Sequence, residues 1–205
     1  SFKHDNIVRV YEAGEESGVH FIIMEYIEGK SLKALMEEQG FSFSSIFLVL
    51  METAKGLQAV EKMNVIHRDI KPENLLLNTD GCLKIIDLGL AKQLPKIDDE
   101  AADPSLTAVF QSEKTLGSPG YMAPEASLAP ELVDIRSDLY SLGATAYHLV
   151  SGETMFQGKT LSEVIMHHIN TPVEPLHKKV ADIPQKLEMI IMKLVEKNPQ
   201  DRYQS

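Results

Sequence analysis

Apolar and polar residues are distributed along this chain so that short strands are expected first and helices later. The runs "VRVYEAG" (8–14) and "VHFIIMEYI" (19–27) are rich in β-branched and aromatic residues, and the turn-like "EESG" separates them. This pattern predicts a β-hairpin. Two further apolar runs, "NLLLN" (74–78) and "LKIID" (83–87), flank Asp80-Gly81 and predict a second hairpin.

Helical patterns dominate the remainder of the chain. "SLKALMEEQG" predicts a short helix from a cap at Ser31 to Gly40, and "DLYSLGATAYHLVSG", apolar on nearly all sides, predicts a central buried helix ending at Gly152. "LEMIIMKLVEKNP" predicts an amphipathic helix stopped by Pro199. Strands early and helices late indicate the α+β class. A further helix is expected over 44–63, with one buried face formed by Ile46, Leu50, Ala54, Leu57 and Val60.

Residues 90–116 show no sustained periodicity and contain the acidic run "IDDEAAD". A loop of this length is unusual inside a compact domain and suggests a functional role. An acidic run could favour basic substrates, although such runs are usually only solvated.

Composition narrows the classes of function. The 205 residues, 43% of them hydrophobic, suffice for one sizeable domain or two lobes. The formal charge of −10 argues against nucleic acid as a partner, and the surface is poorly suited to anionic lipid. A single cysteine, Cys82, excludes an internal disulfide and a cysteine-based zinc site, which fits a reducing, cytoplasmic location. No apolar run of about 18 residues is present, so any membrane tether is expected outside these residues.

The stretch "NVIHRDIKPENLLLN" (64–78) places costly polar groups beside apolar runs. If Asn78 pairs with Leu83 across the second hairpin, Leu76 lies opposite Ile85 and Asn74 lies opposite Asp87. Asn74 and Asp87 would then present an amide oxygen and a carboxylate side by side, which are hard ligands suited to Mg²⁺. Asp69 leads into the same end as a proton acceptor, and Lys71 adds a compact positive charge suited to phosphate. The set predicts phosphoryl transfer.

Taken singly, these residues have simpler explanations. An Asn at the start of a strand is usually a cap or turn residue, and an Asp at its end usually caps a helix. His67 alone is more often a satisfied core histidine than a functional one. The combination is what favours catalysis.

Three segments carry a resemblance to the protein kinase family. "HRDIKPEN" resembles the catalytic loop, "DLG" (87–89) resembles the metal-binding DFG triplet with Leu88 in place of Phe, and "GSPGYMAPE" (117–125) resembles the segment ending in APE. The resemblance covers essentially the whole chain and implies ATP and Mg²⁺ as cofactors. It implies Asp69 as the catalytic base, and Asn74 and Asp87 as metal ligands.

Several individual residues resemble their counterparts in serine/threonine kinases, including the kinases of bacteria. The resemblance implies that Lys71 steadies the transferred phosphate and that Ser118 contacts both the base and this lysine; the partner is then a protein with a Ser or Thr acceptor. Arg68 is similar to the arginine that pairs with a phosphate on the activation loop, where Thr115 is the favoured acceptor, followed by Ser112 and Thr107. For adenine, the resemblance implies Met24 as gatekeeper, backbone groups of Glu25 and Ile27 on the base, Ser31 near the ribose, and Leu76 under the ring. It also implies that Asp138 braces the catalytic loop and that Glu125 and Arg202 form a structural ion pair.

Other family elements are missing. None of the 12 glycines are two apart, so there is no G-x-G-x-x-G, and no VAIK-like strand precedes residues 19–27. The expected division is a remnant of the small lobe with the hinge (1–28) and a large lobe incomplete at its C-terminal end (29–205). A fragment of a longer kinase, poorly active in isolation, is favoured over a truncated, non-catalytic scaffold or binding module. A small-molecule or lipid kinase is a further alternative, although "KPEN" and the APE segment favour a protein substrate.

Overall fold

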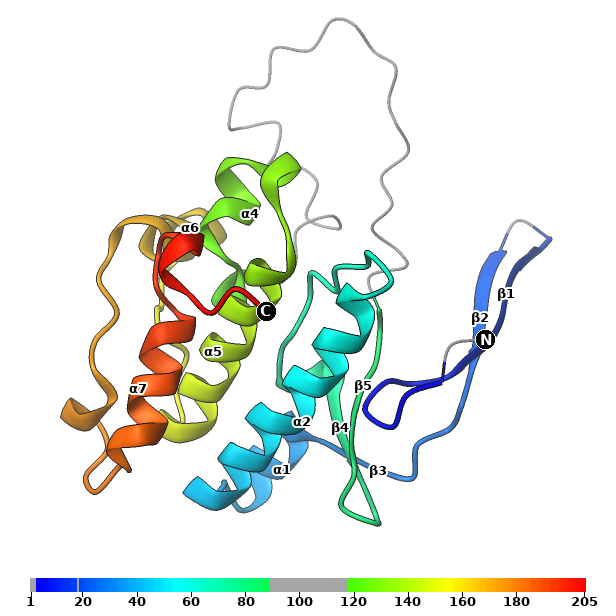
Figure 1. Ribbon diagram of the computed structural model, residues 1–205, viewed down its shortest axis with the longest axis horizontal. Coiled ribbons are helices and arrows are strands. Elements are labelled where there is room, and N and C mark those ends of the chain that lie inside the picture. The colour runs from blue at the N-terminus through cyan, green and yellow to red at the C-terminus, as the bar shows by residue number, and fades with distance from the viewer. Residues whose placement is uncertain (1–2, 18, 89–117) are drawn as a thin grey trace, which may run out of the picture.

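The computed structural model describes residues 3–17, 19–88 and 118–205, and its elements follow the predicted α+β order (Figure 1). The strands are β1 (Val10–Glu16), β2 (Val19–Met24), β3 (Gly29–Ser31), β4 (Leu75–Asn78) and β5 (Leu83–Ile85). The α-helices are α1 (Leu32–Glu38), α2 (Phe43–Glu61), α4 (Pro124–Leu128), α5 (Ile135–Ser151), α6 (Leu161–Asn170) and α7 (Gln185–Leu194). The 3-10 helices are η1 (Pro72–Asn74), η3 (Pro119–Tyr121), η4 (Pro130–Leu132), η5 (Leu176–Lys178) and η6 (Pro199–Asp201).

The strands of the described residues form two sheets. β1 and β2 pair antiparallel, from Val10 opposite Met24 to Glu16 opposite Val19, which confirms the first predicted hairpin. This hairpin extends away from the rest of the protein (Figure 1). The second sheet has the order β3-β4-β5 and contains the second predicted hairpin. Its β3 strand was not predicted, because three residues carry too little pattern to be recognised.

The register predicted for the second hairpin is wrong by one residue. Leu75, not Leu76, lies opposite Ile85, and Leu77 lies opposite Leu83. The cause is the turn: the N–H of Asn78 donates to the carbonyl of Cys82 over 3.0 Å, and Gly81 adopts a left-handed φ of 81°. The loop is therefore one residue shorter than expected, a tight turn that glycine permits.

Helix α1 begins at the predicted cap, where the Ser31 hydroxyl accepts from the backbone N–H of Ala34 over 3.2 Å. Helix α2 packs against β5 and α5. A Cβ added at Gly56 would lie 2.6 Å from Ile85 Cδ1, so glycine allows this close approach. The predicted buried face of α2 is right except at Ala54, which is exposed while Thr53 is buried. By length and composition α2 could cross a membrane, a test that core helices also pass, and its packing makes it a core helix.

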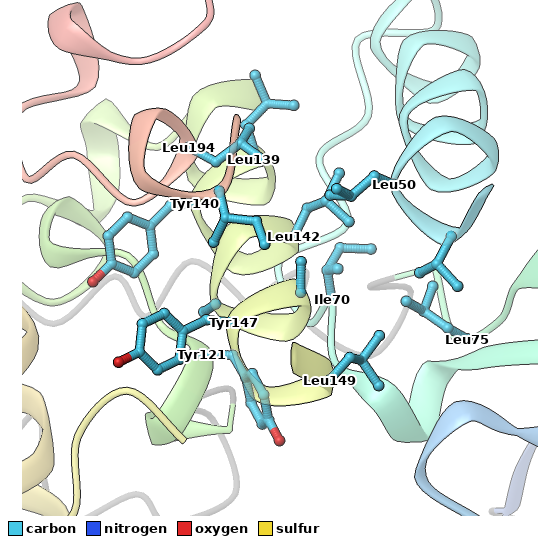
Figure 2. Close-up of a cluster of buried hydrophobic side chains, with 14 of the residues drawn as sticks. Leu50, Ile70, Leu75, Tyr121, Leu139, Tyr140, Leu142, Tyr147, Leu149 and Leu194 are labelled. Atoms are coloured by element: carbon cyan, nitrogen blue, oxygen red, sulfur yellow. The ribbon is translucent and has the colours of Figure 1, made fainter. Parts of the chain in front are cut away.

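Helix α5 lies at the centre of the core, as its all-round apolar pattern predicts (Figure 2). Its Tyr140 and Tyr147 are fully buried. A Cβ at Gly143 would come within 2.6 Å of Leu194, so this glycine lets α5 and α7 approach closely. The helix ends at the predicted Gly152, whose φ of 76° suits a left-handed C-cap.

Helix α6 was not predicted from the sequence, although the sequence contains a signal for it. Thr160 caps this helix by accepting from the N–H of Glu163 over 3.2 Å. Thr160 and Glu163 have the T-x-x-E spacing of a capping box, which marks a helix N-terminus. Helix α7 is confirmed, but it ends at Leu194 rather than continuing to the segment before Pro199.

Candidate active site

Helix α5 supports the segment that carries Asp69. Asp138 is fully buried, and its carboxylate accepts from the backbone N–H of His67 over 2.7 Å and of Arg68 over 2.8 Å. Burial raises the pKa of Asp138, while His67 and the two N–H donors act in the opposite direction. Arg68 has a left-handed φ of 66°, a conformation unusual for a non-glycine residue. The two hydrogen bonds to Asp138 help to maintain this turn immediately before Asp69.

Asp69, Lys71, Asn74 and Ser118 form one hydrogen-bonded cluster. Lys71 Nζ lies 2.9 Å from Asp69 Oδ2 and donates to Ser118 Oγ over 2.7 Å. The backbone N–H of Ser118 donates to Asp69 Oδ1 over 3.2 Å. Asn74 Nδ2 donates to the backbone carbonyl and to Oδ2 of Asp69, over 2.8 and 3.0 Å. The contacts of Ser118 with both Asp69 and Lys71 are those the resemblance implied.

Asn74 and Asp87 lie at the same end of the hairpin, but they are not directly opposite each other as predicted. The N–H of Ile86 donates to the carbonyl of Asn74 over 2.9 Å, so the partner of Asn74 is Ile86. Since side chains alternate between the faces of a strand, an extended Asp87 would point to the other face from Ile86. Asp87 instead leaves the strand with a left-handed φ of 57°. The backbone turn, not the register, therefore sets the direction of this carboxylate.

The donor set fits a magnesium ion bound through few protein ligands. The Nδ2 atom of Asn74 is engaged with Asp69, which leaves its Oδ1 as the ligand atom. Asp87 is exposed and supplies a carboxylate. Within residues 3–17, 19–88 and 118–205 no group of three or more His, Cys, Asp or Glu could hold a metal. Mg²⁺ suits this arrangement because it usually takes one or two carboxylates and completes its shell with phosphate oxygens and water.

His67 connects the segment that carries Asp69 to the segment that carries Asp87. It is fully buried; its Nδ1 accepts from the N–H of Asp69 over 3.2 Å, and its Nε2 therefore donates to the carbonyl of Ile86 over 2.8 Å. The sequence favoured a satisfied core histidine, and its burial and hydrogen bonds confirm that description. Because Ile86 immediately precedes Asp87, His67 also ties the Asp69 segment to the Asp87 segment, a link that the sequence did not reveal.

The residues expected around adenine lie in a second region. Met24 ends β2, and Glu25 and Ile27 follow in the connection to β3. Ser31 and Leu76 are cross-strand partners on β3 and β4. The Ser31 hydroxyl also caps α1, so its observed partner is backbone. Within the described residues, the side chains of Lys71 and Asn74 form no hydrogen bond with Met24, Glu25 or Ile27.

A buried ion pair anchors the segment that follows Ser118. Arg202 Nη1 and Nη2 donate to Glu125 Oε1 and Oε2 over 2.6 and 2.8 Å, which confirms the expected pair. Arg202 also donates to the carbonyls of Glu196, Lys197 and Arg136, and its guanidinium lies 4.8 Å from the Tyr140 ring. Burial alone raises the pKa of Glu125, but the bonds and charge of Arg202 outweigh it and lower the pKa.

The expected phosphate acceptors Thr107, Ser112 and Thr115 lie outside the described residues, as do Gly89 and Gly117.

Comparison with known proteins supplies independent findings. The sequence matches the protein kinase domain over residues 1–205. A probable serine/threonine-protein kinase of Clostridium perfringens is 32% identical over 206 residues, which is 100% of this chain and 28% of that protein. Serine/threonine-protein kinase PrkC of Bacillus subtilis is 32% identical over 206 residues, covering 100% of the chain and 30% of the relative. PknB of Mycolicibacterium smegmatis is 30% identical over 210 residues, covering 100% and 32%. The chain thus spans about a third or less of the length of these relatives.

Proposed function

Because the chain belongs to the protein kinase family and is related to bacterial serine/threonine kinases, we propose that it transfers the γ-phosphoryl group of ATP to Ser or Thr hydroxyls of a protein. The observation that carries this proposal is the cluster in which Lys71 and Ser118 both contact the Asp69 carboxylate. A carboxylate held by a cation and a backbone N–H is positioned to receive a proton without having to reorganise during the reaction.

The proposed reaction is an in-line phosphoryl transfer. The substrate hydroxyl oxygen forms a bond to the γ-phosphorus, the bond from that phosphorus to the bridging β–γ oxygen breaks, and ADP leaves with the electron pair. Asp69 orients the hydroxyl and accepts its proton, while Lys71 neutralises charge on the moving phosphoryl group. The kinase family generally uses ATP with Mg²⁺, and Asn74 and Asp87 are the residues that would hold the metal here. When bound, the metal neutralises the charge of the phosphate oxygens.

The proposal also includes a binding site for the adenine base of ATP. We assign the base to the connection between β2 and β3, with Met24 as gatekeeper, backbone groups of Glu25 and Ile27 on its edge, Ser31 near the ribose, and Leu76 beneath the ring. The cross-strand pairing of Ser31 with Leu76 supports this assignment, since it places two of these residues together. The boundary near residue 28 falls between the two sheets and supports a division into two lobes. A cytoplasmic location is part of the same proposal.

The test is transfer of labelled γ-phosphate from Mg·ATP to a generic Ser/Thr-rich protein by the full-length polypeptide. Asp69→Asn keeps the size of the side chain but loses the proton acceptor, so transfer is expected to fall at least about 100-fold. Asp80→Asn, an exposed carboxylate in the hairpin turn, is the matched control and should retain full activity.

Each alternative predicts a different outcome. No transfer by the unchanged protein, with its loop phosphorylated, would favour a non-catalytic scaffold. Transfer to sugars or aminoalcohols but not to protein would indicate a small-molecule kinase. Transfer that survives Asp69→Asn unchanged would contradict the role of this residue.

A further inference from the structure

An ion pair links Glu25, in the connection between β2 and β3, to β5, the strand that leads to Asp87. Lys84 on β5 donates to Glu25 Oε1 over 2.7 Å, and the side chains retain only 18% and 23% of their exposure. By contrast, the Lys33–Glu37 pair on α1 spans 3.2 Å and is 38% and 64% exposed. Exposed pairs of the second kind contribute little. The partial burial and the shorter distance of the Lys84–Glu25 pair favour a more specific role.

Glu25 is held by more than Lys84. Its Oε1 also accepts from the backbone N–H of Arg9 over 2.9 Å, and its own N–H donates to the carbonyl of Arg9 over 2.8 Å. The adjacent residue Val8 donates its N–H to the carbonyl of Ile85 over 2.9 Å. Both the backbone and the carboxylate of Glu25 are thus connected to β5, one route through Arg9 and Val8, the other directly through Lys84.

The position of Lys84 in the sheet makes this link relevant to a ligand. Lys84 is the direct cross-strand partner of Leu76, and such partners project from the same face. Leu76 is the residue assigned beneath the adenine ring, and Glu25 is assigned to its edge. Lys84 therefore lies on the face of the sheet that the base would occupy, and its ammonium group donates to the Glu25 carboxylate.

We propose that Lys84 is a positioning residue for the nucleotide, which fixes the Glu25 backbone at the edge of the adenine site by holding the Glu25 carboxylate. This inference rests on the proposed function, because the adenine site is part of that proposal. Lys84 does not touch the reacting atoms and acts through Glu25.

The charges around Glu25 agree with this role. Burial by itself raises the pKa of Glu25, but the hydrogen bond from Lys84, the N–H of Arg9 and the charges of both residues outweigh it and lower the pKa. The carboxylate is accordingly ionised at neutral pH. Without Lys84, a partly buried anion would stand beside a site for an anionic nucleotide, with its side chain less constrained.

The experiment measures binding of adenosine and ADP to the full-length polypeptide by calorimetry, alongside steady-state kinetics in ATP. Lys84→Met is expected to weaken adenosine about 10-fold, and to raise the KM for ATP by a similar factor with kcat within about twofold. Lys84→Arg keeps the charge and should restore most of the affinity. Lys84→Met combined with Glu25→Gln removes both charges and should lose less affinity than Lys84→Met alone. Lys33→Met, from the exposed pair, is the matched control.

Adenosine affinity unchanged in Lys84→Met would overturn the proposal. So would a fall in kcat and in the stability of the fold with adenosine affinity retained, because that result describes a purely structural residue. Adenosine has no phosphates and its binding requires no transfer. A protein whose affinity for adenosine depends on Lys84 but that transfers no phosphate would therefore contradict the proposed function and leave this inference standing.

Discussion

The Asp138 carboxylate accepts the backbone N–H of His67 over 2.7 Å, although 71 residues separate them in the chain. Asp138 lies in α5, where 14 of the 17 residues are buried, and His67 begins the segment that carries Asp69 and Lys71. This core helix thereby supports the loop through the hydrogen bonds of Asp138. Groups on such a support keep their geometry better than groups on an unsupported loop.

Replacing Asp138 by Asn tests this support. One carboxylate oxygen becomes an NH₂ group, which faces a backbone N–H instead of accepting from it. Leaving one buried donor unsatisfied is expected to cost about 1–3 kcal/mol in the free energy of unfolding. Urea denaturation measures this loss, and hydrogen exchange should quicken at the amides of His67 and Arg68. Asp134→Asn, at the half-exposed cap of α5, is the control. Faster exchange at the amides of His67 and Arg68 in Asp134→Asn but not in Asp138→Asn would contradict the assignment.

Lys71 and Ser118, which both contact the Asp69 carboxylate, should differ in importance. Lys71→Met removes the cation 2.9 Å from Asp69 and is expected to slow phosphate transfer by about 100- to 1000-fold. Ser118→Ala removes only the hydroxyl bonded to Lys71, while the backbone N–H to Asp69 remains, so a loss of about 10-fold is expected. Single-turnover kinetics measure the rate of phosphate transfer in each of the two variants. Exposed Lys30→Met should change nothing, and a Ser118→Ala defect as severe as that of Lys71→Met would contradict this ranking.

The Glu125–Arg202 pair should matter for stability far more than a surface pair. Glu125→Gln leaves the fully buried guanidinium of Arg202 without its carboxylate, and the expected cost is about 3–5 kcal/mol. Glu153→Gln, which breaks an exposed pair with Lys179 at 3.3 Å, should cost at most about 1 kcal/mol. Urea unfolding at neutral pH measures both. Equal effects of the two substitutions would show that burial of the pair has no energetic consequence.

His168 on α6 should make the fold sensitive to acid. Burial, assisted by the charges of Lys197 and His167, lowers the pKa of His168 to about 3. Its Nδ1 therefore stays neutral and bonds to the Tyr140 hydroxyl over 2.8 Å. Between the unfolded pKa of 6.5 and about 3, only the unfolded chain takes up this proton. His168 thus reduces stability as pH falls through this window, by up to about 1.4 kcal/mol per pH unit.

His168→Gln removes this titration while retaining an acceptor for Tyr140. The variant should be less stable than the unchanged protein at pH 7, because packing is lost, and the difference should narrow toward pH 4. Urea unfolding at successive pH values measures the two slopes. His20→Gln, at an exposed position on β2, serves as control. Parallel pH profiles for His168→Gln and the unchanged protein would contradict the assignment.

The sequence by itself determined the order and type of most elements and the identity of the polar cluster. The all-round apolar pattern of α5, the cap at Ser31 and the group Asp69, Lys71 and Asn74 are local patterns, because periodicity, capping and motif spacing involve residues close in the chain. Even the missed helix α6 has a local signal in Thr160 and Glu163.

Only the tertiary structure decided the contacts between distant segments, while the geometry of its own turn decided the register of the second hairpin. The observed register differs from the predicted one by one residue because Asn78 closes a tight turn: its N–H donates to the carbonyl of Cys82, and its Oδ1 accepts from the N–H groups of Asp80 and Cys82. The Lys84–Glu25 pair joins residues 59 apart. Their positions depend on how separate elements pack, and a carboxylate that finds its donor 71 residues away leaves no periodic trace in the sequence.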